Sequence, residues 1–331
     1  MQSLDLDVLD QATKWRRAGH EVNLITVVET FGSAPRPPGA LLAVRDDAVV
    51  AGSVSGGCVE DDLIHRVRHG EKISKPQLIT YGVTREEAAR FGLPCGGTLR
   101  LIQEPLADYA WAETVLAEAA EHKLVARQLE LATGRVTLGP ATRDTEVDFD
   151  GKILTQPFGP RWRLLLIGAS QVSQLVAGFA LPLGYEVIIC DPREEYTAVW
   201  NDPGVQLLKG MPDDVVNEIG VDAHTAVVAL THDPKLDDMA LIEALHTDAF
   251  YIGALGSRVN SQKRRKRLEE FELGQDEIAK LRGPIGLHIG SRTPAEIAIS
   301  LMAEITAVRN GVAVTQVKDG QPIPANACAA G

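Results

Sequence analysis

Two cysteines lie beside Gly-Gly pairs, where a thiol could do chemistry. Cys58 follows two glycines and precedes an acidic run in SVSGGCVEDD, and Cys95 precedes two glycines in FGLPCGGTL. A cysteine at the start of a helix has its thiolate favoured by the positive end of the helix dipole. Glu60 and its two acidic neighbours would oppose that ionisation. Two interpretations stay open: reactive or ligating thiols held on backbone turns, or small residues in tight packing.

Arg36 stands between prolines in ETFGSAPRPPGALLAV, a segment that also contains a Gly-Ser turn at Ser33 and a further glycine, Gly39. The prolines restrict the backbone, so little entropy is lost when the guanidinium binds a ligand. Such an arginine suits gripping an anion, because its planar fork matches carboxylate and phosphate groups. The alternative is a surface connection between two strands.

A strand, a glycine turn and a helix are predicted by LLLIGASQVS, with DPR downstream. This arrangement presents backbone N–H groups and a positive dipole end to a phosphate. Asp191 comes 23 residues after Gly168, close to the spacing of about 20 residues expected of an acid that binds a ribose hydroxyl. However, Ser170 and Ser173 stand at the later small-residue positions of this fingerprint. A dinucleotide site and a Rossmann fold without a nucleotide both stay open.

Three more polar turns follow strand-like runs in the second half, in THDPKLDD, IGALGSRVNSQ and LHIGSRTPAE. Open α/β sheets bind ligands at the edge where their parallel strands end. A histidine there, His232, could bind a phosphate or act as an acid or base. The alternative is a loop that caps the next helix, with Asp233 as N-cap. The two Gly-Ser-Arg turns favour an anion pocket.

The elements that must position these residues differ between the two halves. Residues 1–155 read as mixed α and β, with a helix near the N-terminus, a polar helix candidate over 84–92, short strands and a hairpin at Asp46-Asp47. From residue 162, continuous apolar strands alternate with helices, which is typical of a parallel sheet covered on both faces. We therefore expect a Rossmann-like doubly wound domain over 162–315 and a tail over 316–331. The Pro- and Gly-bearing segment 155–162 is the expected boundary.

The bulk composition excludes several classes of protein. With 331 residues and 45% hydrophobic residues, the chain can bury a large core. Its formal charge of −12 disfavours a general nucleic-acid or membrane-surface binder. The basic run KRRKR is interpreted as a solvated helix face. The first residues have no signal-peptide pattern, so a cytoplasmic protein with reduced thiols is expected, and the lack of a C-x-x-C motif argues against structural zinc.

Seven motifs together resemble one known family. FGSAPRPPGA, GSVSGGCVEDDLI, FGLPCGG, LLLIGASQVSQLVAGFALPLGYEVIICDPR, THDPKLDDMAL, YIGALGSR and PIGLHIGSRTPAEIAISLMAEI follow one another from about residue 30 to residue 308. Their order is similar to that of the XdhC/CoxI family, the accessory proteins of xanthine dehydrogenase, carbon monoxide dehydrogenase and related molybdenum hydroxylases. One departure is that family members often carry GAGHVA where this chain has GASQVS, which weakens a nucleotide role for this turn.

The resemblance implies an α/β protein in which an N-terminal mixed α/β XdhC/CoxI domain precedes a C-terminal Rossmann-like doubly wound parallel-sheet domain. It also implies binding of the molybdenum cofactor, as molybdopterin or molybdopterin cytosine dinucleotide. Such a protein would shield the cofactor, assist its sulfuration with a cysteine desulfurase, and deliver it to an apo molybdenum hydroxylase. We expect a homodimer with no nucleic-acid or membrane partner.

The leading hypothesis is therefore a cofactor-handling chaperone rather than a turnover enzyme, and no catalytic residue is assigned. The alternative is an NAD(P)-dependent oxidoreductase with a nucleotide in the Rossmann domain; a third idea is transfer of cytidylate onto molybdopterin. Cys58 and Cys95 are candidates for contact with molybdenum or sulfur. The full set of candidate cofactor-binding residues is Ser33, Arg36, Gly39, Ser55, Gly56, Gly57, Cys58, Glu60, Cys95, Gly96, Gly97, Gly168, Ser170, Asp191, Arg193, His232, Asp233, Gly256, Ser257, Arg258 and Gly290.

Overall fold

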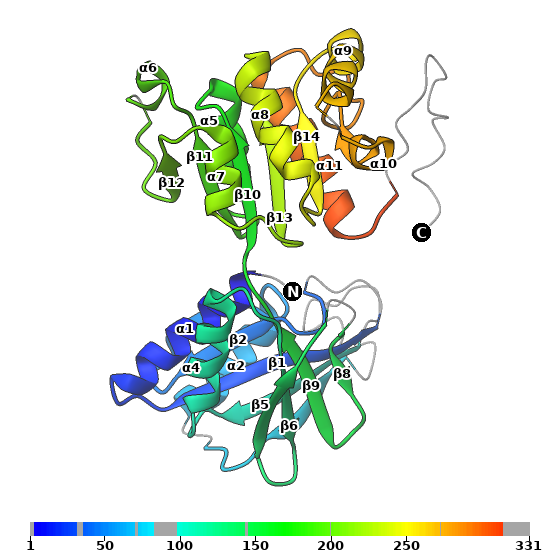
Figure 1. The fold of residues 1–331 in the computed structure, drawn as a ribbon. Coiled ribbons are helices and arrows are strands. Elements are labelled where there is room, and N and C mark those ends of the chain that lie inside the picture. The colour runs from blue at the N-terminus through cyan, green and yellow to red at the C-terminus, as the bar shows by residue number, and fades with distance from the viewer. Residues whose placement is uncertain are drawn as a thin grey trace, which may run out of the picture. The chain divides into compact units, whose positions relative to one another are not determined.

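The computed structural model of the chain describes residues 3–31, 36–69, 72–82, 98–142, 145–198, 200–271 and 273–313 (Figure 1). The chain divides into two compact units, Met1–Arg161 and Trp162–Gly331, called here the N-terminal and C-terminal units. The segment 84–92, expected to be a polar helix, and the expected tail over 316–331 lie outside the described residues. Within the described ranges, no helix combines the length and the apolar character needed to cross a membrane.

The N-terminal unit is built on a five-stranded sheet with the order β3-β2-β1-β5-β4, in which neighbouring strands are antiparallel. A second, four-stranded sheet has the order β7-β6-β9-β8. The elements are α1 (Ser3–Arg17), β1 (Val22–Phe31), β2 (Leu41–Arg45), β3 (Val50–Gly52), α2 (Cys58–Arg68), β4 (Gln77–Tyr81), β5 (Thr98–Pro105), α4 (Ala110–Ala120), β6 (Val125–Glu130), β7 (Val136–Pro140), β8 (Asp148–Phe149) and β9 (Ile153–Phe158).

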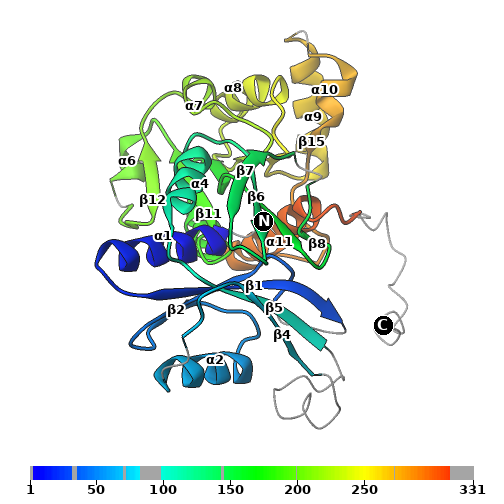
Figure 2. The same ribbon diagram turned by 90° about the horizontal axis from the view of Figure 1, so that it is seen from below.

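Strand β2 explains why both faces of the five-stranded sheet are covered. Successive side chains of a strand point to opposite faces. Leu41 and Ala43 pack into the core that contains α1 and α4. Leu42 and Val44 pack into a second core with residues of α2. Figure 2 shows α1 and α2 on opposite sides of this sheet. The continuous apolar run GALLAV is therefore a buried strand, although the sheet is antiparallel.

The C-terminal unit is a six-stranded parallel sheet with the order β12-β11-β10-β13-β14-β15. This is the doubly wound order in which the first strand lies at the centre and the chain winds outward on both sides. The elements are β10 (Trp162–Ile167), α5 (Gln171–Ala180), β11 (Tyr185–Cys190), α6 (Glu194–Thr197), β12 (Val205–Leu208), α7 (Pro212–Glu218), β13 (Thr225–Ala229), α8 (Pro234–Leu245), β14 (Tyr251–Ala254), α9 (Arg258–Glu269), α10 (Gln275–Ala279), β15 (Leu281–Arg282) and α11 (Pro294–Arg309).

Helices cover both faces of the parallel sheet. From the central strand β10, Leu164 and Leu166 pack into the core that contains α5 and α11. Leu165 and Ile167 pack on the other face, with residues of α7 and α8. The fold class expected from the sequence, a mixed α/β unit followed by a Rossmann-like unit, is confirmed.

Candidate functional site

The loop before α2 is organised by a single carboxylate, that of Glu60. One oxygen, Oε1, accepts hydrogen bonds from the Ser53 hydroxyl at 2.7 Å and from the amides of Val54, Ser55 and Gly56 at 2.9, 2.7 and 2.9 Å. The other oxygen, Oε2, accepts from the Gly57 amide at 2.9 Å and from the Ser55 hydroxyl. Residues 53–57 are called here the Glu60 loop.

Those hydrogen bonds set the ionisation of Glu60. Burial of the side chain opposes the charged form, but the hydroxyls of Ser55 and Ser53 and the loop amides favour it more. The pKa of Glu60 therefore falls to about 2. The carboxylate occupies the backbone donors of Gly56 and Gly57 that the sequence suggested for a ligand. The cofactor-binding role of Ser55, Gly56, Gly57 and Glu60 stays a prediction.

Cys58 is the first residue of α2, directly after the Glu60 loop, and it is exposed. The helix below it is fixed by the buried residues Val59 and Leu63. Asp62 accepts hydrogen bonds from Tyr81 on β4 and from Arg66, both at 2.8 Å. Gly56 has a φ of 88°, which a residue with a side chain rarely adopts. The exposed thiol therefore lies where the chain is fixed by the hydrogen bonds to Glu60 before Cys58 and by the packing of α2 after it.

Arg36 points toward α1. Its Nη2 donates to Asp5 at 3.5 Å, and the same Asp5 oxygen accepts from the amide of Leu41 at 3.1 Å. The Nε atom of Arg36 is buried and has no hydrogen-bond partner among the described residues. Gly39 follows with a φ of 90°, and an added Cβ would lie 2.9 Å from Val147 Cγ2. Both residues thus have structural roles, and their role in binding an anion stays a prediction.

The remaining N-terminal candidates are Ser33, Cys95, Gly96 and Gly97, and they lie outside the described residues. Within the described ranges, no group of three or more His, Cys, Asp or Glu side chains could hold a metal ion.

In the C-terminal unit, Asp191 binds the glycine turn instead of facing solvent. The Asp191 carboxylate is fully buried and accepts from the amide of Ala169 at 2.8 Å. Arg193 donates to it through Nε and Nη2, both at 2.8 Å. Burial opposes the charge, but Arg193 and the backbone amides outweigh it and lower the pKa of Asp191. The acid that the sequence suggested for a ribose hydroxyl thus has four donors from the protein itself, counting the Arg193 amide at 3.1 Å.

Ser170 and Ser173 form hydrogen bonds within the glycine turn itself. Ser170 is the N-cap of α5 and accepts from the amide of Ser173 at 3.2 Å. The Ser173 hydroxyl donates to the carbonyl of Gly168 at 2.5 Å. Gly168 has a φ of 108°, and an added Cβ would lie 3.1 Å from the backbone nitrogen of Thr231. The turn therefore packs directly against the end of β13.

His232 comes directly after Thr231, just beyond the end of β13. Its φ of 63° is unusual for a residue with a side chain. The preceding Thr231 donates its amide and hydroxyl to Asp237, at 3.1 and 2.7 Å. The next residue, Asp233, is the N-cap of α8 and accepts from the amide of Lys235 at 2.9 Å. The histidine is exposed here on a fixed turn, and its role toward a ligand stays a prediction.

An arginine network that the sequence interpretation missed lies beneath this turn. Arg264 is 6% exposed and donates to Asp237 at 2.8 Å and to Asp238 at 3.1 Å. Its Nη1 donates to the carbonyl of Leu255, just after β14, and Arg267 donates to Asp238 at 2.6 Å. The interpretation of KRRKR as a solvated helix face is therefore wrong for Arg264. Helical spacing could have revealed it, since Ser261, Arg264 and Leu268 form the buried face of α9.

The two Gly-Ser-Arg turns begin helices. Ser257 is the N-cap of α9 and accepts from the amide of Asn260 at 3.2 Å, with Gly256 before it and Arg258 as the first helical residue. Gly290 has a φ of 79° and is exposed. In the turn after it, Glu296 accepts from the amides of Arg292 and Thr293 at 2.6 and 2.9 Å. As in the Glu60 loop, the protein's own carboxylate binds the amides at this helix start.

The strand order and the glycine turn at the centre of the sheet define the C-terminal unit as a Rossmann-type domain. Residues 164–305 match the family model of the XdhC Rossmann domain, and residues 15–82 match that of the XdhC and CoxI family. The chain therefore belongs to the XdhC and CoxI family.

Two curated relatives extend along nearly the whole chain. "Molybdenum cofactor insertion chaperone PaoD" of Escherichia coli is 29% identical over 304 residues, which cover 91% of this chain and 88% of the relative. A probable xanthine dehydrogenase subunit of Bacillus subtilis is 29% identical over 321 residues, which cover 89% of this chain and 95% of the relative.

A solved structure from Bacillus halodurans, described as a xanthine dehydrogenase, has the same fold. It is 22% identical, with a TM-score of 0.74, and the match covers 93% of this chain and 96% of that one.

Proposed function

We propose that this protein binds the molybdenum cofactor as cargo, protects it, assists its sulfuration and delivers it to an apo molybdenum hydroxylase of the xanthine dehydrogenase type. The observation that carries this proposal is the similarity to the molybdenum cofactor insertion chaperone PaoD along 91% of the chain. The match to the XdhC and CoxI family in both units supports it.

The position of Cys58 supports a role in contacting the cargo. Thiolate sulfur is a soft ligand, and the molybdenum centre of this cofactor is bound by sulfur. An exposed thiol on a turn whose backbone donors are already bound by Glu60 needs little reordering to meet a ligand. Cys58 could then contact molybdenum or carry the sulfur during sulfuration, and Cys95 is the proposed second sulfur.

The carboxyl ends of β10 and β13 are the proposed contact for the phosphate or pyrophosphate of the cofactor. His232 is exposed there, and Arg193 keeps part of its side chain in solvent beside Asp191. Hydrogen bonds from an imidazole, or from the N–H groups of Arg193 that Asp191 leaves free, suit a phosphate. The alternative, an NAD(P)-dependent oxidoreductase, has less support, since the Asp191 carboxylate is bound by Ala169 and Arg193.

The partners belong to the same proposal. The apo hydroxylase would receive the loaded cofactor, a cysteine desulfurase would supply the sulfur, and the protein would act in the cytoplasm as a homodimer. The form of the cofactor, molybdopterin or its cytosine dinucleotide, would follow from the hydroxylase served.

Purification of the protein from molybdate-supplied cells tests the proposal. We expect molybdenum by elemental analysis and pterin fluorescence after acid oxidation, in a fixed ratio to protein. Adding the loaded protein to the apo hydroxylase should restore hydroxylase activity, and adding a desulfurase with cysteine should raise it further. Protein without pterin that oxidises NAD(P)H with a carbonyl substrate would contradict the proposal and favour the oxidoreductase.

A further inference from the structure

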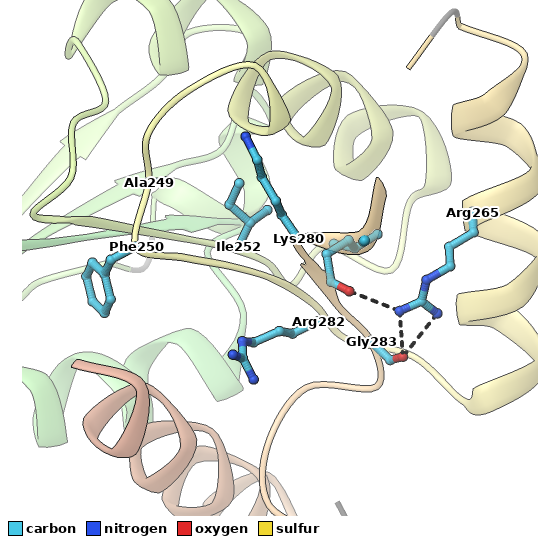
Figure 3. Close-up of a pocket in the computed structure, with 9 residues that line it drawn as sticks. Ala249, Phe250, Ile252, Arg265, Lys280, Arg282 and Gly283 are labelled. Atoms are coloured by element: carbon cyan, nitrogen blue, oxygen red, sulfur yellow. Dashed lines mark hydrogen bonds between the residues drawn. The ribbon is translucent and has the colours of Figure 1, made fainter. Parts of the chain in front are cut away.

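A cavity of about 420 Å³ lies at the β15 edge of the parallel sheet, beside the paired strands β14 and β15 (Figure 3). Phe250 and Ile252 line it from the β14 side, and Lys280, Arg282 and Gly283 line it from the β15 side. The turns with Gly168 and His232 follow the carboxyl ends of other strands, so this cavity is a separate feature of the C-terminal unit.

Two of its cations meet carbonyl oxygens, not carboxylates. Arg265 of α9 also lines the cavity, and it donates to the carbonyls of Leu281 at 2.9 Å and Gly283 at 3.3 Å (Figure 3). Lys280 donates to the carbonyls of Leu245 at 3.2 Å and Thr247 at 3.5 Å. Carbonyl dipoles position these side chains but do not neutralise them.

Other arginines of the same unit are neutralised. The guanidinium of Arg193 forms a bidentate pair with Asp191. The guanidinium of Arg264 is bound by Asp237 and Asp238. Arg265 follows Arg264 directly in sequence, yet its guanidinium donates to carbonyl oxygens and lacks a carboxylate partner among the described residues. Of these three arginines, the one without a carboxylate partner in the part of the chain that the structure describes is Arg265, which lines the cavity.

The negative charges near the cavity are few. Arg282 meets Glu304 at 3.4 Å, and this buried carboxylate also accepts from the Tyr251 hydroxyl at 2.6 Å and from the amide of Gly286 at 2.7 Å. Glu277 lies close enough to interact with Lys280. Its two oxygens are bound by His246 and the amide of Gly274, both at 2.8 Å. Neither carboxylate lines the cavity. Of the three cations that line the cavity, only Arg282 forms an ion pair with a carboxylate within the described ranges, which leaves a local excess of positive charge in a chain of net charge −12.

We propose that this cavity binds the phosphoryl groups of a small anionic metabolite. A phosphoryl group carries about 1.5 to 2 negative charges at neutral pH, which complements the local excess of positive charge. The guanidinium of Arg282 suits contact with phosphate oxygens, Arg265 keeps N–H groups beyond those that donate to Leu281 and Gly283, and Lys280 adds a point charge. The volume exceeds that of one phosphate, and the half-buried Phe250 supplies an apolar face for the rest of the ligand. Free pyrophosphate and a nucleoside diphosphate share this chemistry.

Titration of the full-length protein with inorganic pyrophosphate and with ADP, by calorimetry in about 150 mM salt, tests the proposal. We expect saturable binding with one site per chain, weakened about tenfold by Lys280→Ala. Lys280 is exposed, so this change should leave the fold intact, as circular dichroism will verify. The matched control is Lys263→Ala, which removes the same charge from the exposed side of α9 and should leave binding unchanged.

The two ligands distinguish the source of the phosphoryl group. Tighter binding of ADP identifies a nucleotide, and equal binding identifies the pyrophosphate unit itself; both support the site. Absence of saturable binding, or equal weakening by Lys263→Ala and Lys280→Ala, would overturn the proposal. Equal competition by citrate would also overturn it, because the site would then recognise charge without the phosphoryl group. None of these outcomes depends on molybdenum or on hydroxylase activity.

Discussion

The carboxylate of Glu60 accepts the amide hydrogen of Gly57 at 2.9 Å, immediately before the residue that carries the exposed thiol. Four consecutive amides, from Val54 to Gly57, donate to this one side chain. The backbone that presents Cys58 is therefore fixed by a residue two positions after it in the helix. The position of the thiol depends on the charge of Glu60.

Glu60→Gln should loosen the Glu60 loop. An amide has one acceptor oxygen and no charge, so it cannot replace a carboxylate that accepts six hydrogen bonds. We expect the amides of residues 54–57 to exchange their hydrogens at least about tenfold faster, as mass spectrometry of hydrogen exchange can measure. Glu269→Gln, an exposed residue near the end of α9, is the control and should change nothing in this loop.

The same carboxylate should make stability depend on pH. Its pKa is about 2 in the folded protein and 4.5 in its ordinary state. A lowered pKa contributes stability that is fully present above the ordinary value and is lost as pH falls toward the folded value. The contribution is on the order of 2 kcal/mol after allowance for solvent screening. Denaturant unfolding of the wild type and Glu60→Gln should show a difference at pH 6 that shrinks toward pH 2. A difference in unfolding free energy that stays constant between pH 6 and pH 2 would contradict this contribution of Glu60.

Cys58→Ala should reduce cofactor retention without unfolding the protein. The thiol is exposed, so we expect a change below about 0.5 kcal/mol in the free energy of unfolding and a clear loss of co-purified pterin. Cys190→Ala is the matched control, because that thiol is buried in the core and burial raises its pKa to about 12. It should cost about 1 kcal/mol and keep the pterin. Unchanged pterin in Cys58→Ala would exclude a ligand role.

Alkylation gives an independent measure of the same two thiols. Iodoacetamide should label Cys58 in the native protein and Cys190 only after unfolding, as peptide mass spectrometry can locate. Labelling of Cys190 at the rate of Cys58 would contradict the burial described for β11.

Gly168→Ala should destabilise the C-terminal unit. The new Cβ would lie 2.9 Å from Thr231 Cγ2 and 3.1 Å from the Thr231 backbone, at a φ of 108°. We expect a loss of about 2–3 kcal/mol in the free energy of unfolding. The control is Gly178→Ala in α5, where an added Cβ meets no atom within 4 Å. That change should stabilise the helix by about 0.5–1 kcal/mol. Equal effects at both glycines would contradict the close packing of the turn.

Arg264→Met should be strongly destabilising. It would leave the buried Asp237 without its cation and Asp238 with Arg267 alone, and breaking such a group typically costs about 3–5 kcal/mol. Lys263→Met, the neighbouring exposed residue, should change the unfolding free energy by less than about 0.5 kcal/mol. Comparable losses in the two variants, measured by urea denaturation, would contradict the buried network.

The long strands of both units were predictable, because their apolar runs are long and their turns contain glycine, proline or aspartate. The strand-like run before the second Gly-Ser-Arg turn is a correction: residues 283–290 form no strand, and β15 covers only Leu281–Arg282. The short strand β12 was not predicted. The run LLLI of β10 and the alternation of cores along β2 follow directly from side-chain periodicity. The roles of Glu60, Asp191 and Arg264 could not be predicted, because a charged residue in the sequence does not reveal whether its partner is a ligand or another part of the protein. A capping side chain and a bound phosphate both accept hydrogen bonds from the free amides at the start of a helix. A Gly-Ser turn before a helix is therefore compatible with either.

The strand order of the C-terminal unit bears on how the protein is made. The central strand β10 is followed within a short stretch by β11 and β12, which extend the sheet on one side of it. Its other neighbour, β13, begins only at Thr225. During synthesis, half of the sheet can form while one edge of β10 stays open until β13 emerges. An open edge of apolar strand can pair with another chain. Between the synthesis of β11 and that of β13, the nascent chain therefore exposes an apolar strand edge that the finished sheet covers.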